Sequence, residues 1–467
     1  MKRAAAVYTA LAALQRGLAL LLLPFLTRAM SVEEFGATSI LAAGYALFVI
    51  LLSFAFEPAV LSASIRELSD PTERDIIRAA RLALLLVSPV LAVLLALGVW
   101  FSGQSLFGVG AELWAIEIVA CGVTVFGLTY AMPRLRAHQN LRAYSIVAIA
   151  TIVAALGSKL GLMVFLPLGP LGWALSDLIA GLAGTLSALV VLRRDTLHRG
   201  PFAIRRLAGL SLPLLPHLAS LWIINSISRP LIEAVLTLRD VGLYSAAASA
   251  SGAAMVICLE INRATNVEYA HDRFPAPSPR SAQAMKLQLS ASVALAVLVC
   301  ALTPAYVNLV LPPEYDAVQP LLAILSLTVV FWTVYAIATA FTTLAARITK
   351  WTWTGSLGGV VVTVLGTLGL AATWGVLGVA VAAVLAQITI AALAIVLHRA
   401  LGLRLDWREG GVTGWWVFRA AAALGLAVAP DLFQWGVVPW LLATAGALML
   451  SGGDLIARLR PRSSGLI

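Results

Sequence analysis

The chain has 467 residues, of which 61% are hydrophobic and 12% charged, and its mean hydropathy is +0.94. This composition excludes a soluble globular domain, because a water-exposed surface needs far more charged side chains. The net charge of +10 requires no nucleic acid to explain it, since the Lys and Arg residues gather in short segments between apolar stretches.

Apolar stretches of about 20 residues, the length that crosses the hydrocarbon layer, follow one another along the chain. They lack the ten-residue alternation of a membrane barrel, so each is predicted to be a helix. The first is too long for the apolar core of a signal peptide. We expect an all-α polytopic membrane protein of about 14 spans: 4–27, 37–62, 82–101, 113–133, 143–166, 171–192, 208–236, 242–262, 287–309, 320–344, 352–373, 375–397, 412–430 and 434–456.

The basic residues predict an orientation. If the amino terminus is cytoplasmic, all but six of the 32 Lys and Arg residues fall on the cytoplasmic side, as the positive-inside rule requires. Both termini are therefore expected in the cytoplasm. Of the six exceptions, two lie in outer loops and four within spans: Arg28 and Arg239, then Arg16, Lys159, Arg229 and Arg419.

A basic linker at 193–206 follows six spans and precedes another six. We expect an N-lobe at 1–195 with spans 1–6, a C-lobe at 196–400 with spans 7–12, and two further helices with a basic cytoplasmic tail at 401–467. The motif Glu33-Glu34-Phe35-Gly36 returns in outline 206 residues later, as Arg239-Asp240-Val241-Gly242. Parallel repeats of this kind are common in transporters, with the substrate path between the lobes. A central cavity between two six-helix lobes is thus predicted.

Two motifs suggest a family. Residues 23–36, Leu-Pro-Phe-Leu-Thr-Arg-Ala-Met-Ser-Val-Glu-Glu-Phe-Gly, resemble the opening signature of the polysaccharide (Wzx-like) flippases of the multidrug/oligosaccharidyl-lipid/polysaccharide exporter superfamily. The segment from Leu212-Pro213 through Ser228-Arg229 to Val241-Gly242-Leu243-Tyr244 resembles the same family. The resemblance covers roughly residues 1–400.

The resemblance implies a flippase in the bacterial inner membrane, not an enzyme. It would move a polyprenyl-pyrophosphate-linked oligosaccharide, such as a lipopolysaccharide O-antigen, capsule or exopolysaccharide repeat unit, from the cytoplasmic to the outer leaflet by alternating access. We expect a monomer without cofactor or metal, aided by polysaccharide polymerase and export proteins. Two alternatives stay open: a lipid II flippase, although the expected arginines of the first two helices are few, and a cation-coupled multidrug antiporter, although 4–27 contains no acid.

Charges inside a membrane need a reason, because each costs several kcal/mol in hydrocarbon. Guanidinium groups bind pyrophosphate oxygens with forked hydrogen bonds. Arg16, Arg229 and Lys159 are therefore candidates for the headgroup site, and the alternative for Arg229 is an ion pair with Glu233, one helical turn later.

The acids Glu117 and Asp177 are predicted near the level of Lys159. With Glu233 they form either a structural network or an ion-coupling site driven by a proton or sodium gradient, and the membrane potential would itself help an anionic headgroup outward. Arg28 and Arg239 are candidates for outer-side release of the pyrophosphate. The cysteines, Cys121, Cys258 and Cys300, have no metal or disulfide spacing and are predicted to be buried and free.

Overall fold

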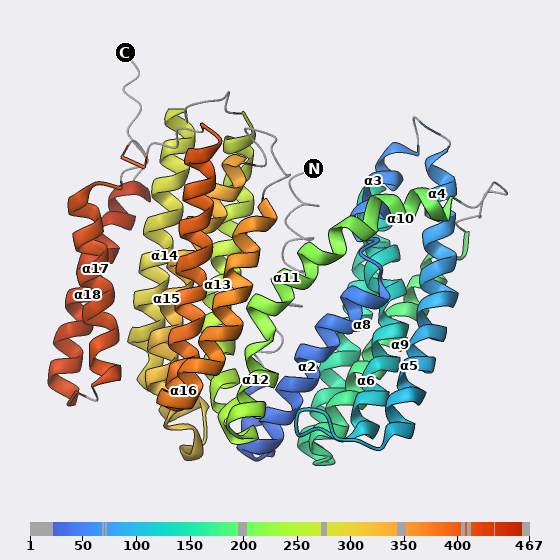
Figure 1. Cartoon of the computed structure of the whole chain (residues 1–467), viewed down its shortest axis with the longest axis horizontal. Coiled ribbons are helices and arrows are strands. Elements are labelled where there is room, and N and C mark those ends of the chain that lie inside the picture. Colours follow the sequence, from blue (N-terminus) through green and yellow to red (C-terminus); the bar gives the residue numbers. More distant parts are fainter. Residues whose placement is uncertain are drawn as a thin grey trace. The chain divides into compact units, whose positions relative to one another are not determined.

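The structure, a computed structural model, describes residues 22–67, 70, 72–194, 203–271, 278–342, 352–402, 407–408, 412–433 and 435–459. Within these ranges all regular structure is helical, apart from one isolated bridge between Leu106 and Val109. Figure 1 labels the helices in chain order. The predicted all-α class is confirmed.

The helices before residue 236 are α2 (Val32–Leu52), α3 (Glu57–Arg66), α4 (Glu73–Leu82), α5 (Ser88–Ser102), α6 (Ala111–Val125), α7 (Met132–Ala137), α8 (Leu141–Lys159), α9 (Gly169–Val191), α10 (Ile204–Ser211), α11 (Leu215–Ser226) and α12 (Ser228–Val235). After them come α13 (Leu238–His271), α14 (Pro279–Ala305), α15 (Val318–Ala340), α16 (Thr352–Ala400), α17 (Gly414–Leu432) and α18 (Val437–Leu459). Wider π-helical turns join or extend several of them: η1 (Ala83–Val87), η2 (Phe126–Ala131), η3 (Leu160–Phe165) and η6 (Tyr306–Val310).

Eleven helical stretches among the described residues are long and apolar enough to span a membrane. They coincide with the second to thirteenth predicted spans, because one stretch, Gly355–Ala400, covers two of them. The apolar part of α18, Val438–Ser451, corresponds to the fourteenth. The predicted first span, 4–27, lies mostly outside the described residues. The chain is a multi-pass membrane protein, as predicted.

Gly375 divides the long helix α16. Its φ of 59° and ψ of −145° form a combination that only glycine adopts readily. The break falls between the predicted spans 352–373 and 375–397, so the prediction of two spans here is confirmed.

Two other predicted spans are broken helices. The expected helix 37–62 ends at Leu52, because Phe54 and Ala55 take left-handed φ values of 51° and 55°. Pro58 then lies in the first turn of α3, where its missing N–H costs no helical hydrogen bond. The prediction of one continuous helix was wrong there, since apolar composition runs on across the break.

The expected helix 208–236 is likewise divided, into α10, α11 and α12. Pro213 opens a short 3-10 turn, η5 (Leu212–Leu214), and Pro216 lies in the first turn of α11. Proline interrupts a continuous helix because it removes a donor and clashes with the preceding turn.

Packing divides the chain into two units, Met1–Gly242 and Leu243–Ile467. In the first unit α6 packs against α2, α5 and α9, and α8 packs against α9. In the second, α15 packs against α14 and α16, while α17 and α18 pair with each other and contact α14 (Figure 1).

The segment α10–α12 belongs to the first unit. The indole N–H of Trp222 on α11 donates to the carbonyl oxygen of Ala43 on α2 (2.7 Å), and Arg206 on α10 pairs with Glu73 on α4 (2.8 Å). The boundary by packing thus follows α12. The predicted lobes, 1–195 and 196–400 with the tail 401–467, describe an internal repeat and stay predictions.

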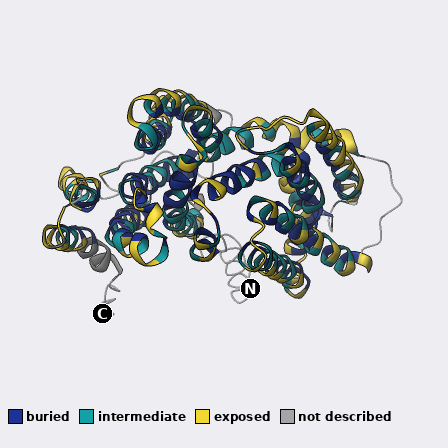
Figure 2. Ribbon diagram, turned by 90° about the horizontal axis from the view of Figure 1, so that it is seen from below, coloured by how far each residue is buried: buried dark blue, intermediate teal, exposed yellow. Residues whose placement is uncertain are grey.

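Burial follows the pattern of a membrane protein. In Figure 2 the exposed residues lie along outward helix faces, and many of them are large and apolar, such as Leu94, Val153 and Leu365 at 60%, 62% and 65% exposure. Extended apolar surface of this kind suits lipid rather than water. The polar side chains that are buried inside each unit therefore mark the places that need a functional or structural reason.

Small residues let the helices of the first unit approach closely. A β-carbon on Gly44 of α2 would overlap the indole ring of Trp114 on α6. We expect Gly44→Leu to lower the free energy of unfolding by about 1–3 kcal/mol through overpacking, measured by thermal unfolding in detergent. Gly98→Leu on α5 is the matched control, since nothing lies within 4 Å of its β-carbon position; equal effects of the two substitutions would contradict the expectation.

Candidate functional site

Three charged side chains meet inside the first unit. Lys159, the last residue of α8, places its Nζ 2.9 Å from Oδ1 of Asp177 on α9. Lys159 is 7% exposed, so the pair is largely shielded from solvent. The structure thus brings together two residues that the sequence placed at one level.

Glu117 on α6 completes this group, which we call the unit 1 charge cluster: Glu117, Lys159 and Asp177. Glu117 is 0% exposed and interacts electrostatically with both of the others. Among the described residues no donor reaches either of its carboxylate oxygens. The carboxyl group of Asp177 also acts on Glu117 electrostatically, and two ionised carboxylates repel each other.

The cluster carries one ammonium group for two carboxyl groups. Fully ionised, it would hold a net negative charge in the interior of a membrane protein, which is costly. One bound proton or one bound monovalent cation would make it neutral.

Trp173 was not among the predicted site residues, and the structure places it beside Lys159. The Nζ of Lys159 lies 3.3 Å from the centroid of its ring, a cation–π contact. Trp173 and Asp177 are one helical turn apart on α9, so both face Lys159. The four-residue spacing of Trp173 and Asp177 is the sequence signal that could have predicted the contact between Trp173 and Lys159.

Tyr45 and Cys121 lie beside the cluster and were not predicted to do so. The Tyr45 hydroxyl donates to Oγ1 of Thr124 (2.9 Å), and the Cys121 thiol donates to the carbonyl oxygen of Tyr45 (3.5 Å). These contacts tie α2 to α6 next to Glu117. Cys121, Cys258 and Cys300 are all free and buried, as predicted.

Arg229 and Glu233 both lie on α12. An Nη1 hydrogen of Arg229 is donated to the carbonyl oxygen of Asn225 (3.3 Å), one turn earlier. A carboxylate oxygen of Glu233 lies next to Gly108, whose φ of 69° shapes the α5–α6 loop. Glu233 thus lies beside the loop between α5 and α6, and the ion pair with Arg229 that the spacing suggests stays a prediction.

Three further predicted cations remain: Arg16, Arg28 and Arg239. Arg28 is exposed at the end of the described helical segment that precedes Ser31, and Arg16 lies outside the described residues. Arg239, at the start of α13, pairs with Glu33, at the start of α2, over 3.5 Å. The roles predicted for Arg16, Arg28, Arg229 and Arg239 remain predictions.

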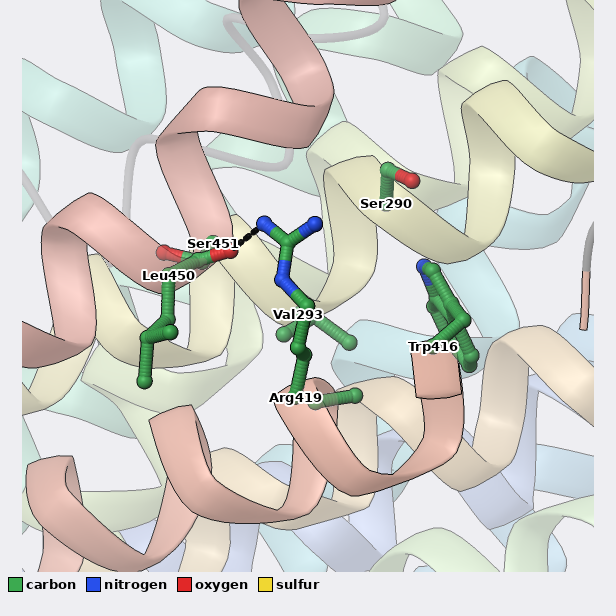
Figure 3. Close-up of a pocket in the computed structure, with 7 residues that line it drawn as sticks. Ser290, Val293, Trp416, Arg419, Leu450 and Ser451 are labelled. Atoms are coloured by element: carbon green, nitrogen blue, oxygen red, sulfur yellow. Dashed lines mark hydrogen bonds between the residues drawn. The ribbon is translucent and has the colours of Figure 1, made fainter. Parts of the chain in front are cut away.

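Arg419 has a structural role. Its guanidinium donates to the carbonyl oxygen of Leu450 on α18 (2.7 Å), beside a cavity of about 10 Å³ that Ser290, Trp416 and Ser451 help to line (Figure 3). A space of that size suits a single water molecule rather than a ligand. Arg419 thus fastens α17 to α18.

Among the described residues no group of three or more His, Cys, Asp or Glu side chains is arranged to hold a metal ion.

The family described as polysaccharide biosynthesis protein matches residues 1–266. No curated protein matches the chain. Among solved structures, the lipid II flippase MurJ in an inward closed conformation has a TM-score of 0.66 at 12% identity, over 91% of this chain and 96% of that one.

Two transporters of the MOP superfamily are also similar. An inward-facing multidrug resistance MATE family transporter has a TM-score of 0.59 at 13% identity, over 82% of this chain and 94% of that one. A Pyrococcus furiosus transporter, whose structure was described as having a binding pocket of reverse polarity, has a TM-score of 0.53 at 11% identity, over 85% and 95%. At such identities the likeness concerns the fold. Because the family match spans more than half of the sequence, this chain belongs to the polysaccharide biosynthesis protein family, and it has the fold of the MOP superfamily transporters.

Proposed function

We propose that this chain is a flippase that moves a polyprenyl-pyrophosphate-linked oligosaccharide from the cytoplasmic to the outer leaflet by alternating access. Membership of the polysaccharide biosynthesis family carries the proposal. The shared fold with a lipid II flippase supports it, since that protein's named substrate is also a lipid. The protein lies in the bacterial inner membrane with both termini in the cytoplasm, as the distribution of Lys and Arg indicates.

The cargo is an O-antigen, capsule or exopolysaccharide repeat unit, handed on to a polymerase and export proteins. Its headgroup is anionic, and Arg229 and Arg16 are the cations that we assign to the pyrophosphate, because guanidinium groups form forked bonds to such oxygens. Lys159 is assigned to the charge cluster instead, since it is buried against Asp177 and Trp173.

The charge cluster supplies the coupling. A proton or sodium ion that binds between Glu117 and Asp177 makes the interior of the first unit neutral, and its release leaves a buried negative charge. Such a change in electrostatic energy can bias two conformations only if they hold the ion with different affinities. We assign this difference in ion affinity to Glu117, whose carboxylate oxygens receive no hydrogen bond from the described residues.

The test is headgroup translocation in proteoliposomes. Purified protein is reconstituted with a fluorescent undecaprenyl-pyrophosphate oligosaccharide, and a membrane-impermeant quencher reports which leaflet holds the label. We expect protein-dependent movement, a loss of at least about tenfold in Arg229→Ala, and partial recovery in Arg229→Lys, which keeps the charge without the fork.

The controls separate the alternatives. Arg263→Ala is the matched variant, because Arg263 pairs with Glu260 on its own helix over 2.6 Å and has no assigned role in transport. Lipid II and a cationic dye are offered in the same vesicles. Movement of lipid II alone would favour a lipid II flippase, movement of the dye alone would favour a drug antiporter, and movement of the oligosaccharide lipid with full activity in Arg229→Ala would remove the assignment of Arg229.

A further inference from the structure

Three neighbouring spans of the first unit lose regular α-helical geometry toward the ends that the basic residues assign to the cytoplasm. Between α2 and α3 the chain passes through the left-handed turn at Phe54 and Ala55, while η1 divides α4 from α5 and η2 divides α6 from α7. The helix after each irregularity has proline as its second residue: Pro58, Pro89 and Pro133. Proline cannot continue a regular helix because it lacks the N–H donor. Since η2 contacts both η1 and α3, we call the left-handed turn, η1 and η2 together the break layer.

Beyond the break layer, four short helices pack into one body, the inner cap: α3, α4, α7 and α10. Both α7 and α10 pack against α3, and α4 packs against α3 and α10. Figure 1 shows α3, α4 and α10 together at one end of the unit. Each of the four helices contributes a side chain that is at most 3% exposed to the same apolar cluster: Val60, Ile76, Leu135 and Leu207. The four helices of the inner cap thus share a buried core.

Ion pairs also join the parts of the inner cap to one another. An Nη1 hydrogen of Arg134 on α7 is donated to Oε1 of Glu67, directly after α3 (3.3 Å), and Nε2 of His138 lies 2.6 Å from the same oxygen. Arg206 on α10 pairs with Glu73 on α4 over 2.8 Å. Both glutamate side chains are less than 10% exposed. Buried polar contacts of this kind rigidify the elements that they connect, so we expect the cap to move as one body.

The other connections that the structure describes between the inner cap and the rest of the unit are irregular too. The turn from α7 to α8 contains Gln139, which has a left-handed φ of 52°. The chain passes from α10 to α11 through the 3-10 turn that Pro213 helps to form. By contrast, α9 runs unbroken from Gly169 to Val191 and packs against α2, α6 and α8. Irregular turns have poorer helical hydrogen bonds than an α-helix, so the chain bends there most easily.

Ser88, the first residue of α5, has two hydrogen-bond acceptors at the break layer. Its hydroxyl donates to the carbonyl oxygen of Leu52 at the end of α2 (2.7 Å), and the carbonyl oxygen of Ala83 in η1 lies 3.4 Å away. The Phe56 N–H, which a continuous helix would direct to Leu52, bonds Ser53 instead (3.0 Å). Ser88 is 0% exposed, and one hydroxyl hydrogen serves one acceptor at a time. A change of partner is therefore possible without any exposure to solvent.

We propose that the inner cap tilts as a rigid body about the break layer, and that the Ser88 hydroxyl selects between two positions of the cap. In the position that the structure shows, Ser88 donates to Leu52. In the other it donates to Ala83 across η1 and releases the end of α2. Hinges are a few residues at the ends of elements that absorb changes in φ and ψ, and the break layer supplies them in three adjacent spans. The movement lies within the first unit and goes beyond the proposed function, because it requires no substrate.

Distances between paired spin labels test the hinge in the full-length protein in lipid nanodiscs. The native cysteines, which are buried and free, are replaced by alanine. Arg74→Cys on α4 and Arg205→Cys on α10 label exposed positions of the inner cap. Phe101→Cys on α5 and Phe165→Cys at the end of η3 label positions outside the cap that are 81% and 79% exposed. Pulsed electron paramagnetic resonance then gives the distribution of distances for each pair of labels.

We expect one narrow distance for the pair within the cap, Arg74→Cys with Arg205→Cys, and one for the pair outside it, Phe101→Cys with Phe165→Cys. The mixed pair, Arg74→Cys with Phe165→Cys, should give two distances, one for each position of the cap. A single narrow distance for the mixed pair would overturn the proposal. A cap pair as broad as the mixed pair would overturn it too, because the cap would then not be rigid.

Ser88→Ala tests the hydrogen bond at the hinge. It removes the donor and is expected to change the ratio of the two mixed-pair distances about threefold, the effect of one modest hydrogen bond. Ser187→Ala on α9 is the matched control, because that hydroxyl donates to Gly184 of its own helix (2.9 Å). An unchanged ratio in Ser88→Ala would overturn the assignment of Ser88.

The label pairs need no substitution in the break layer, so they decide on the hinge even if Ser88→Ala does not fold. Thermal unfolding reports the folding of each variant. The distances are measured without substrate, which separates the hinge from the proposed function. A protein with one cap position that still flips its lipid would disprove the hinge alone, and a protein with two cap positions that flips no lipid would disprove the proposed function alone.

Discussion

Replacing Lys159 by methionine is expected to lower the free energy of unfolding by about 3–5 kcal/mol, the usual result of leaving a buried charge without its partner. The substitution leaves Asp177 and Glu117 facing each other with no cation among the described residues beside them. It also removes the contact with the Trp173 ring. The measurement is thermal or denaturant unfolding in detergent, followed by the helical signal.

Two further variants serve as controls for this expectation. Arg142→Met removes a cation from the exposed, opposite end of α8 and should stay within about 0.5 kcal/mol of the wild type. Lys159→Met combined with Asp177→Leu should recover much of the loss, because replacing a buried pair by apolar side chains is often neutral. If Lys159→Met alone is as stable as the wild type, the cluster is hydrated and the Lys159–Asp177 pair contributes little to stability.

The sequence predicted the cluster's level in the membrane but not its contacts. Hydropathy places Glu117, Lys159 and Asp177 within spans, and the assignment of spans puts them at similar depth. Which residues touch depends on how α6, α8 and α9 rotate against one another, and no local pattern encodes that rotation. Trp173 shows the same limit, since its position near a helix end also suits an interfacial anchor.

The helix breaks were missed for a different reason. The residues from Leu52 to Glu57 are mostly apolar, so a hydropathy window runs through the left-handed turn at Phe54 and Ala55. Pro58 can be read in the sequence, but a proline is compatible with a kink within a helix as well as with a helix start, so it did not predict the break. At Gly375, by contrast, a glycine stands between two full-length apolar stretches, and there the sequence located the boundary correctly.

The repeat at 206 residues could be read from the sequence only in outline. Its two weak sequence matches correspond to a close reciprocal contact, because a β-carbon on Gly36 would overlap the carbonyl oxygen of Leu238 and one on Gly242 would overlap the carbonyl oxygen of Val32. Neither match reveals this contact alone.

Replacing Glu117 by glutamine is expected to abolish ion coupling while leaving the protein folded. Glutamine is nearly isosteric, can donate to Asp177, and leaves Lys159 and Asp177 as a neutral pair. In proteoliposomes the wild type should flip its lipid faster under an imposed proton or sodium gradient, and Glu117→Gln should flip at one rate whatever the gradient. A wild type that ignores every gradient and the membrane potential would contradict the coupling.

Infrared spectroscopy tests the same carboxyl pair without a substrate. A proton shared between Glu117 and Asp177 gives a protonated carboxyl band in membranes of the wild type, which should disappear in Glu117→Gln. Asp431→Asn is the matched control, because Asp431 is also fully buried but accepts a hydrogen bond from Gln319 (2.9 Å) in the second unit, remote in sequence from the cluster. If the band is lost in Asp431→Asn and kept in Glu117→Gln, the proton does not reside at the cluster, and a bound monovalent cation becomes the better account of its charge.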